Sequence, residues 1–323
     1  MNARTSSVAV VLLIACSAVL TGCPPEARVA VCPGPPLAAE AELVAQNNAN
    51  AAKVPSLRAD ADVEISYVAE GQERSERLRD GMLLLLKRPG SPADVPSFLL
   101  RAVLVSEPYF GAGVDAAAGE HYFWLDPPRG ASVARWGLLE NLDRPDWEML
   151  PVDPVDLLSV LAVLEWPVND RASPILSMPK DDPCLYDLLF FGGAGGAGGV
   201  RLRRQVWLDR TQSPPRPTRV WLFDAWGEVT VDATLSDYRR IDALALPAAQ
   251  RPVMPTDILL RYPREQVIRS LRLRLSNMTV GTEDVPVRPE MFERRRVVPP
   301  GIDDQRPLGP ATQPAVLEAQ ATP

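Results

Sequence analysis

The chain has 323 residues, and its 41 aspartates and glutamates outnumber its 34 lysines and arginines, which gives a formal net charge of −7. This acidic balance argues against a nucleic-acid partner, because proteins that bind nucleic acid usually present a basic face. It also gives no basis for broad electrostatic contact with anionic lipid. The length allows one large domain or two ordinary ones.

The N-terminal residues have the layout of an export signal. Arg4 supplies a positive start, and residues 8–20 form an apolar run that is shorter than the roughly 20 residues a membrane-spanning helix needs. The sequence LTGC at residues 20–23 then resembles the lipobox of bacterial lipoproteins. The resemblance implies that residues 1–22 are a signal peptide and that Cys23 carries acyl chains such as palmitate. A buried N-terminal helix with an incidental cysteine is the alternative.

The composition of the two ends differs from that of the middle. Residues 23–36 are rich in proline and predict a linker between the lipidated cysteine and the domain, whereas residues 298–323 predict a proline-rich tail without structure. One β-rich domain is expected over residues 37–297. Outside the cytoplasm, Cys32 and Cys184 are free to form a disulfide, although two free thiols fit the sequence almost as well.

Two helices are expected. The first covers residues 37–54 and ends at Pro55. The second begins after Asp153, which is a good N-cap, with Pro154 at the first helical position. Its apolar positions follow helical spacing and lie at Leu157, Leu158 and Leu161.

The remaining elements are predicted to be strands. Residues 57–67 alternate apolar and polar side chains, which is typical of a strand with one buried and one solvated face. Gly81 in the next strand indicates a bulge or a close backbone approach. About ten strands are expected, and they suit an unclosed antiparallel β-barrel or a strongly curved sheet. The further strands are predicted over residues 77–87, 98–106, 121–125, 134–139, 200–208, 219–223, 228–235, 257–262 and 270–278.

The sequence carries little that indicates catalysis. His121 is the only histidine, no G-x-S-x-G motif accompanies it, and a partly exposed structural role is expected for it. The glycine-rich residues 192–199 lack the lysine and serine or threonine of a phosphate loop, and they predict a hairpin connection. One histidine and few cysteines argue against a structural zinc site, which needs four clustered ligands. The sequence therefore predicts a protein that is not an enzyme and that holds no metal and no cofactor. A hydrolase built around His121 is the least favoured hypothesis.

The order of these elements resembles that of the LolA/LolB-like lipoprotein-sorting superfamily. The likeness covers residues 40–295 and includes the strand sequences RQVWLD, TRVWLFDAWGEVTVDATLSDY and PTDILLRYP. It implies an unclosed antiparallel barrel with helices over one mouth and an apolar cavity that binds lipid or lipoprotein acyl chains. A membrane-anchored member resembles the receptor LolB more than the soluble carrier. Phe190 and Phe191 are candidates for an apolar projection that contacts a membrane or a partner, or for the end of a core strand.

The sequence thus predicts a lipid-anchored protein of the cell envelope that faces the periplasm, expected on the outer membrane. Its partners are the membrane, acyl chains of lipids or lipoproteins, and envelope proteins. The alternative is an anchored interaction module whose core is filled by its own side chains. The residues expected to face inward and line a cavity are Val63, Ile65, Tyr67, Trp124, Leu157, Leu158, Leu161, Trp207, Trp221 and Phe223.

Overall fold

The computed structural model describes residues 32, 37–69, 71–87, 95–105, 107–127, 132–142, 144, 147–167, 174–179, 181–193, 200–242, 246–264, 267–280, 286–302 and 304–310. The predicted signal segment, Cys23 and residues 311–323 lie outside them. Within the described ranges, no helix combines the length and the apolar composition that crossing a bilayer requires.

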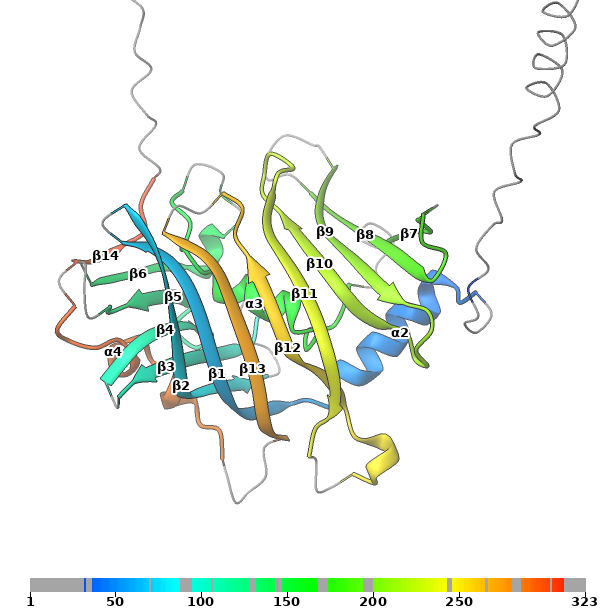
Figure 1. The fold of residues 1–323 in the computed structure, drawn as a ribbon, viewed down its shortest axis with the longest axis horizontal. Helices are drawn as coiled ribbons and strands as arrows, with labels where there is room; N and C mark the ends of the chain where they lie inside the picture. The colour runs from blue at the N-terminus through cyan, green and yellow to red at the C-terminus, as the bar shows by residue number, and fades with distance from the viewer. Residues whose placement is uncertain are drawn as a thin grey trace, which may run out of the picture.

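One large curved sheet forms most of the molecule (Figure 1). Neighbouring strands are antiparallel except at one edge, where β14 runs parallel to β6. The two edge strands, β14 and β7, do not pair with each other, so the sheet is unclosed. The fold class expected from the sequence is confirmed. From one edge to the other the described strands are β14 (Asp304–Pro307), β6 (Val133–Leu138), β5 (Glu120–Leu125), β4 (Glu107–Asp115), β3 (Ser97–Leu104), β2 (Gln72–Leu86), β1 (Ser56–Ala69), β13 (Ile268–Val280), β12 (Val253–Arg261), β11 (Val229–Arg240), β10 (Arg216–Phe223), β9 (Val200–Asp209), β8 (Leu185–Gly193) and β7 (Ile175–Ser177).

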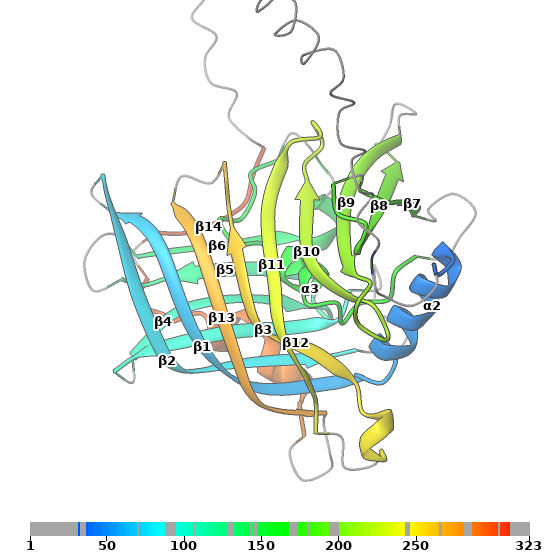
Figure 2. The ribbon, with the colours of Figure 1, turned by 45° about the vertical axis from the view of Figure 1, so that its right-hand side comes forward.

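The helices are short and lie on different parts of this sheet. The turned view shows α3 inside the curve of the sheet and α2 beside the end that carries β7 to β9 (Figure 2). Helix α2 corresponds to the helix predicted over residues 37–54, and α3 to the helix predicted after Asp153. The described helices are α2 (Glu40–Ala51), α3 (Pro154–Val160) and α4 (Arg294–Val297), with 3-10 turns η2 (Leu139–Asn141), η3 (Ala248–Gln250) and η4 (Pro289–Phe292).

Strict alternation of side chains accounts for the central strands. Val63 and Ile65 on β1 are fully buried, and Glu64 between them is not. Pairing with β13 places Val63 opposite Leu273 and Ile65 opposite Leu271. Because opposed side chains in a sheet contact one another, these four residues form one apolar layer on the concave face.

Gly81 marks a place where two backbones approach closely. A Cβ atom added there would lie 2.5 Å from the carbonyl oxygen of Ala61, which is closer than van der Waals contact allows. The register of β1 against β2 also shifts between Ala61 and Val63. The predicted bulge or close approach at Gly81 is therefore confirmed.

Sequence patterns do not predict β4, and the structure shows why. Pro108, Gly111 and Gly113 are residues that ordinarily interrupt strands. The added Cβ atom would lie 2.5 Å from the Trp124 ring at Gly111 and 2.4 Å from the Tyr122 ring at Gly113. These glycines are needed because β4 pairs with β5, whose large rings cover them.

The expectation that residues 298–323 carry no structure is wrong for the part that the structure describes. The backbone of β14 pairs with β6, and the Leu308 N–H donates to the Trp136 carbonyl at 2.7 Å. Ile302 and Leu308 are buried. Few apolar residues are needed here, because the edge of the sheet supplies hydrogen-bond partners for the backbone.

Trp124 does not lie on the concave face as expected. It belongs to a second apolar cluster on the other face of the sheet, together with Tyr122 and Phe292, and the C-terminal segment covers this cluster. Phe123, its neighbour in the chain, belongs to the concave cluster. Because apolar side chains alternate onto both faces of β5, the sequence pattern does not reveal which face Trp124 occupies.

A disulfide joins Cys32 to Cys184, which are 152 residues apart in the chain. Cys184 directly precedes β8. The bridge therefore fastens the segment before α2 to the strand next to one edge of the sheet.

Candidate functional site

An open groove lies between α3 and the ends of β8, β9 and β10. Its volume is about 480 Å³, within the usual range for ligand pockets. We name this hollow the α3 groove. Asp153 and Asp156 of α3 line one side, and a second hollow of about 300 Å³ continues past them towards Tyr262 and Arg264. The strand side of the α3 groove is lined by Phe190, Phe191, Arg203, Arg204, Leu222 and Phe223.

Irregular strand pairing gives this wall its composition. Successive side chains of a regular strand point to opposite faces, yet Phe190 and Phe191 both line the groove, as do Arg203 and Arg204. The pairing of β8 with β9 shifts register between Phe190 and Phe191. Phe190 pairs with Arg204 and Phe191 with Leu202, so the extra residue is Arg203 on β9. A bulge re-aims the side chains of the strand that carries it, and this one accounts for two adjacent arginines at one hollow.

Aromatic rings surround the guanidinium group of Arg204. It lies 4.2 Å from the ring centroid of Phe190 and 5.9 Å from that of Trp166. The two rings contact each other edge to face at 5.3 Å. Burial lowers the pKa of Arg204 to about 10, so the group stays charged at neutral pH. Its Nε atom is buried without a hydrogen-bond partner.

The opposite side of the groove is acidic. The Asp153 carboxylate caps α3 by accepting from the Val155 N–H at 2.8 Å, and it lies 3.4 Å from Nδ1 of His121. Burial, with a smaller contribution from Asp153, raises the pKa of Asp156 well above its ordinary value. His121 is buried, which corrects the expected partial exposure: it lies at a strand start that α3 covers.

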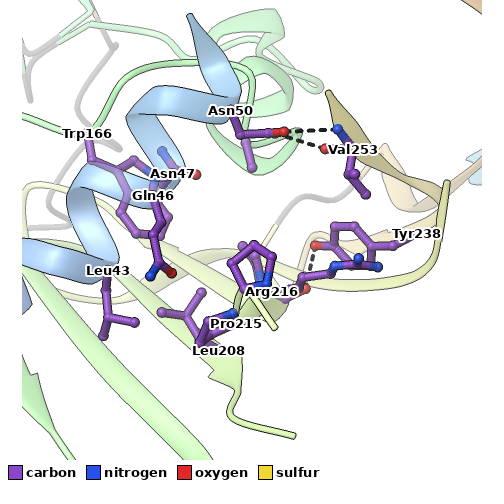
Figure 3. A pocket seen from close by; sticks show the side chains of 13 residues that line it. Leu43, Gln46, Asn47, Asn50, Trp166, Leu208, Pro215, Arg216, Tyr238 and Val253 are labelled. Atoms are coloured by element: carbon purple, nitrogen blue, oxygen red, sulfur yellow. Dashed lines mark hydrogen bonds between the residues drawn. The ribbon is translucent and has the colours of Figure 1, made fainter. Parts of the chain in front are cut away.

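A smaller hollow, the α2 pocket, lies beyond Trp166. Its volume is about 80 Å³, and Leu43, Trp166 and Tyr238 line it (Figure 3). Asn50 fastens α2 to β12 by exchanging two hydrogen bonds of 2.9 Å with the Val253 backbone. Trp166 also contacts Phe190, so the Trp166 ring contributes to the wall between the two hollows.

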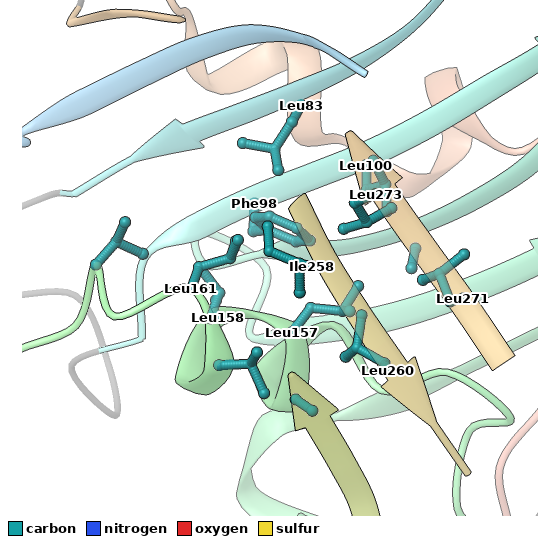
Figure 4. Packing of buried hydrophobic residues seen from close by; sticks show 14 of the residues in the cluster. Leu83, Phe98, Leu100, Leu157, Leu158, Leu161, Ile258, Leu260, Leu271 and Leu273 are labelled. Atoms are coloured by element: carbon teal, nitrogen blue, oxygen red, sulfur yellow. The ribbon is translucent and has the colours of Figure 1, made fainter. Parts of the chain in front are cut away.

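Most of the predicted cavity residues fill the core instead of lining a hollow. Figure 4 shows Leu157, Leu158 and Leu161 packed against Ile258 and Leu260 and their neighbours. All three leucines are buried. The residues Val63, Ile65 and Tyr67 belong to the same cluster.

The expectation that Trp207 and Trp221 face inward is wrong. Both are half-buried, whereas Val206 and Val220 beside them in the chain are buried in the concave cluster. The two tryptophan rings contact each other at 4.9 Å on the outer face, where Arg219 covers them. Apolar residues follow one another in β9 and β10, so alternation alone does not distinguish the two faces.

The two phenylalanines of β8 do not form a projection. Phe190 is buried against Trp166, and Phe191 is half-buried at the α3 groove. Phe223 is the member of the predicted cavity set that does line this groove. Sequence reasoning missed Arg203 and Arg204, although two adjacent arginines within a predicted strand place at least one charge on the buried face.

No family model matches the chain, and no curated protein matches it. Solved structures that are similar include a DUF1329 family protein from Desulfovibrio piger and a putative outer membrane lipoprotein-sorting protein domain from Vibrio parahaemolyticus, both with a TM-score of 0.46. The LolA superfamily protein NE2245 from Nitrosomonas europaea has a TM-score of 0.44. Each is 12% identical over 80% of this chain and is covered over 98%, 99% and 100% of its own length, respectively.

Proposed function

We propose that the chain is a non-enzymatic, lipid-anchored protein of the bacterial cell envelope that binds the acyl chain of a lipid or lipoprotein in the α3 groove. The observation that carries the proposal is an open groove beside the core, with aromatic and aliphatic side chains along its strand side. An acyl chain is the ligand class whose burial such a surface favours. A role in lipoprotein sorting to the outer membrane is the function we assign to this binding.

The energetics of chain burial suit a partly open groove. Each buried methylene contributes about 0.8 kcal/mol, so eight methylenes would contribute roughly 6 kcal/mol before the entropic costs of binding. A chain held along Phe191 and Leu222 therefore binds usefully without being fully enclosed. A chain that is only partly enclosed can also leave the groove more easily, which suits a protein that transfers its ligand to another.

The N-terminal sequence supports anchoring at Cys23. Arg4, the apolar run over residues 8–20 and the small residues before Cys23 have the layout of an export signal with a lipobox. The disulfide between Cys32 and Cys184 supports a location outside the cytoplasm, because such bonds persist in oxidising compartments. Two acyl chains on one cysteine anchor a protein stably to a membrane without a spanning helix.

The filled core favours one alternative, an anchored interaction module that binds no lipid. The packing of Leu157, Leu158 and Leu161 against the sheet (Figure 4) leaves the middle of the concave face occupied by the protein itself. In this alternative the α3 groove receives a partner's side chains.

Native mass spectrometry of the mature chain, with Cys23→Ser and purified from a bacterial periplasm without detergent, tests the proposal. We expect co-purifying acyl lipid or acylated peptide that Phe191→Glu abolishes. Trp207→Glu is the matched control, since it changes a half-buried aromatic residue on the outer face, and it is expected to retain the ligand. A mass that stays ligand-free after incubation with lipids and acylated peptides would favour the interaction module.

A further inference from the structure

The contacts of Arg204 differ from those of Arg219 on β10 and Arg272 on β13. Arg219 pairs with Asp232 at 2.8 Å, and Arg272 pairs with Asp257 at 2.6 Å. Within the described residues, the contacts that the Arg204 guanidinium makes are with the rings of Phe190 and Trp166. Among these described residues, no carboxylate forms an ion pair with the Arg204 guanidinium.

A cation without an opposing charge beside two aromatic rings destabilises the folded protein. Arg204 is partly buried, and taking a charge out of water without an opposing charge is unfavourable. The two rings recover part of this cost by cation–π attraction. Arg204 also lines the α3 groove, so a group bound there is in a position to supply the missing negative charge.

We propose that the α3 groove selects a single-chain amphiphile with an anionic oxygen head, and that Arg204 binds this head while Phe191 and Leu222 contact the chain. This inference rests on the proposed function, which it deepens by naming the class of head group. A guanidinium group presents parallel N–H donors that match the oxygens of a carboxylate or a phosphate. A carboxylate head and a phosphate head therefore both accept hydrogen bonds from Arg204 in the same way.

The charges across the groove give the bound molecule an orientation. Asp153 and Asp156 lie on the α3 side and Arg204 on the strand side. The Asp153 carboxylate repels an anionic head from the first side, and Arg204 attracts it to the second. The head therefore belongs at β9, and the chain runs from there along the apolar wall.

Titration calorimetry on the mature Cys23→Ser chain tests this with four probes of equal chain length: dodecanoate, dodecyl phosphate, dodecanol and dodecyltrimethylammonium. We expect at least one anion to bind about tenfold more tightly than dodecanol, the size of effect that a charge-assisted pair supplies. The cationic probe is expected to bind most weakly. Whether dodecanoate or dodecyl phosphate binds more tightly identifies a fatty-acid-like or a phospholipid-like head.

Arg204→Met keeps the length of the side chain and removes its charge. We expect this variant to lose about tenfold in affinity for the anions and to leave dodecanol binding unchanged. Its melting temperature should be equal or higher, because replacing a partly buried charge that has no carboxylate partner by an apolar group is often neutral or stabilising. Arg219→Met, on the outer face, is the control and should leave binding of every probe unchanged.

Two results would overturn the inference while the proposed function stands: equal affinity of wild type for dodecanol and both anions, or a parallel loss of dodecanol and anion binding in Arg204→Met. Failure of all four probes to bind the wild type would overturn the proposed function itself. If Arg204→Met does not fold, Arg204→Lys replaces it. This variant keeps the charge but loses the forked geometry, and it should weaken anion binding alone.

Discussion

The two ends of the concave face are built differently. Around β1, β13 and α3 the face is filled by leucines such as Leu158 and Leu271. Buried residues alternate along β1 even though its pairing shifts register against β2 and β13. Around β8 to β10 the pairing shifts register at Phe190 and Phe191, charged residues reach the inner side, and a groove of about 480 Å³ remains. One end of the face is therefore filled by the protein's own side chains, whereas the other end leaves a groove.

This contrast separates stability from binding. A change in the filled end should alter the free energy of unfolding and leave ligand affinity unchanged. A change on the strand side of the groove should alter ligand affinity more than the free energy of unfolding. Each of the following substitutions tests that separation.

The largest effect is expected from Leu158→Ala in the filled end. Leu158 is fully buried between α3 and the sheet, and removing such a side chain costs about 2 to 5 kcal/mol through lost burial and the cavity left behind. Urea denaturation of the mature chain measures this loss. Unchanged affinity of the folded variant for an acyl probe is the second expectation, and a marked loss of affinity would show that the two ends are coupled.

A smaller loss is expected from Gly81→Ala. The new Cβ atom would meet the Ala61 carbonyl oxygen at 2.5 Å, and forcing the two strands apart costs about 1 to 3 kcal/mol. Gly301→Ala is the matched control, because nothing lies within 4 Å of a Cβ atom there. If both variants unfold at the same urea concentration, the close approach at Gly81 carries no energetic weight.

At the groove, Phe191→Ala should cost about 1 kcal/mol or less in stability, since the side chain is half-buried. Its effect on acyl binding should be larger than its effect on folding, because the phenyl ring forms part of the wall. Calorimetry with dodecanoate and urea denaturation on the same preparation compare the two. A variant that loses stability as Leu158→Ala does, yet binds the probe normally, would place Phe191 in the core.

The same contrast explains how far the sequence predicts this molecule. Alternation in residues 57–67 predicts β1 and the inward direction of Val63 and Ile65, since a period of two leaves one choice of face. Asp153, Pro154 and the leucine spacing predict α3, because a capping side chain and helical periodicity act locally. These are the elements of the filled end.

The residues that line the groove cannot be predicted from the sequence of any one strand. Whether Trp207 or Val206 faces inward depends on the register between β9 and its neighbours, and a shift of one residue exchanges the two faces. The position of Arg204 beside Trp166 depends on a contact between β9 and the end of the α3 segment, which are far apart in the sequence. Likewise, β14 forms because an edge of the sheet is open to it, and the tail sequence carries little sign of this.

The effect of Asp156→Asn depends on pH and should vanish in acid. Burial, and to a lesser degree Asp153, raise the pKa of Asp156 in the folded protein, so the folded state holds a proton that the unfolded chain has lost. Stability contributed by this group is therefore present below the unfolded pKa and is lost as pH rises through the folded one. Asp156→Asn should match wild type in acid and melt at a higher temperature at neutral pH, a difference that thermal melts between about pH 3 and pH 8 measure. Asp181→Asn, at an exposed position, is the control and should follow wild type throughout. A pH-independent shift for Asp156→Asn would instead reflect the helix start alone, and would indicate that the acidic side of the groove is well solvated.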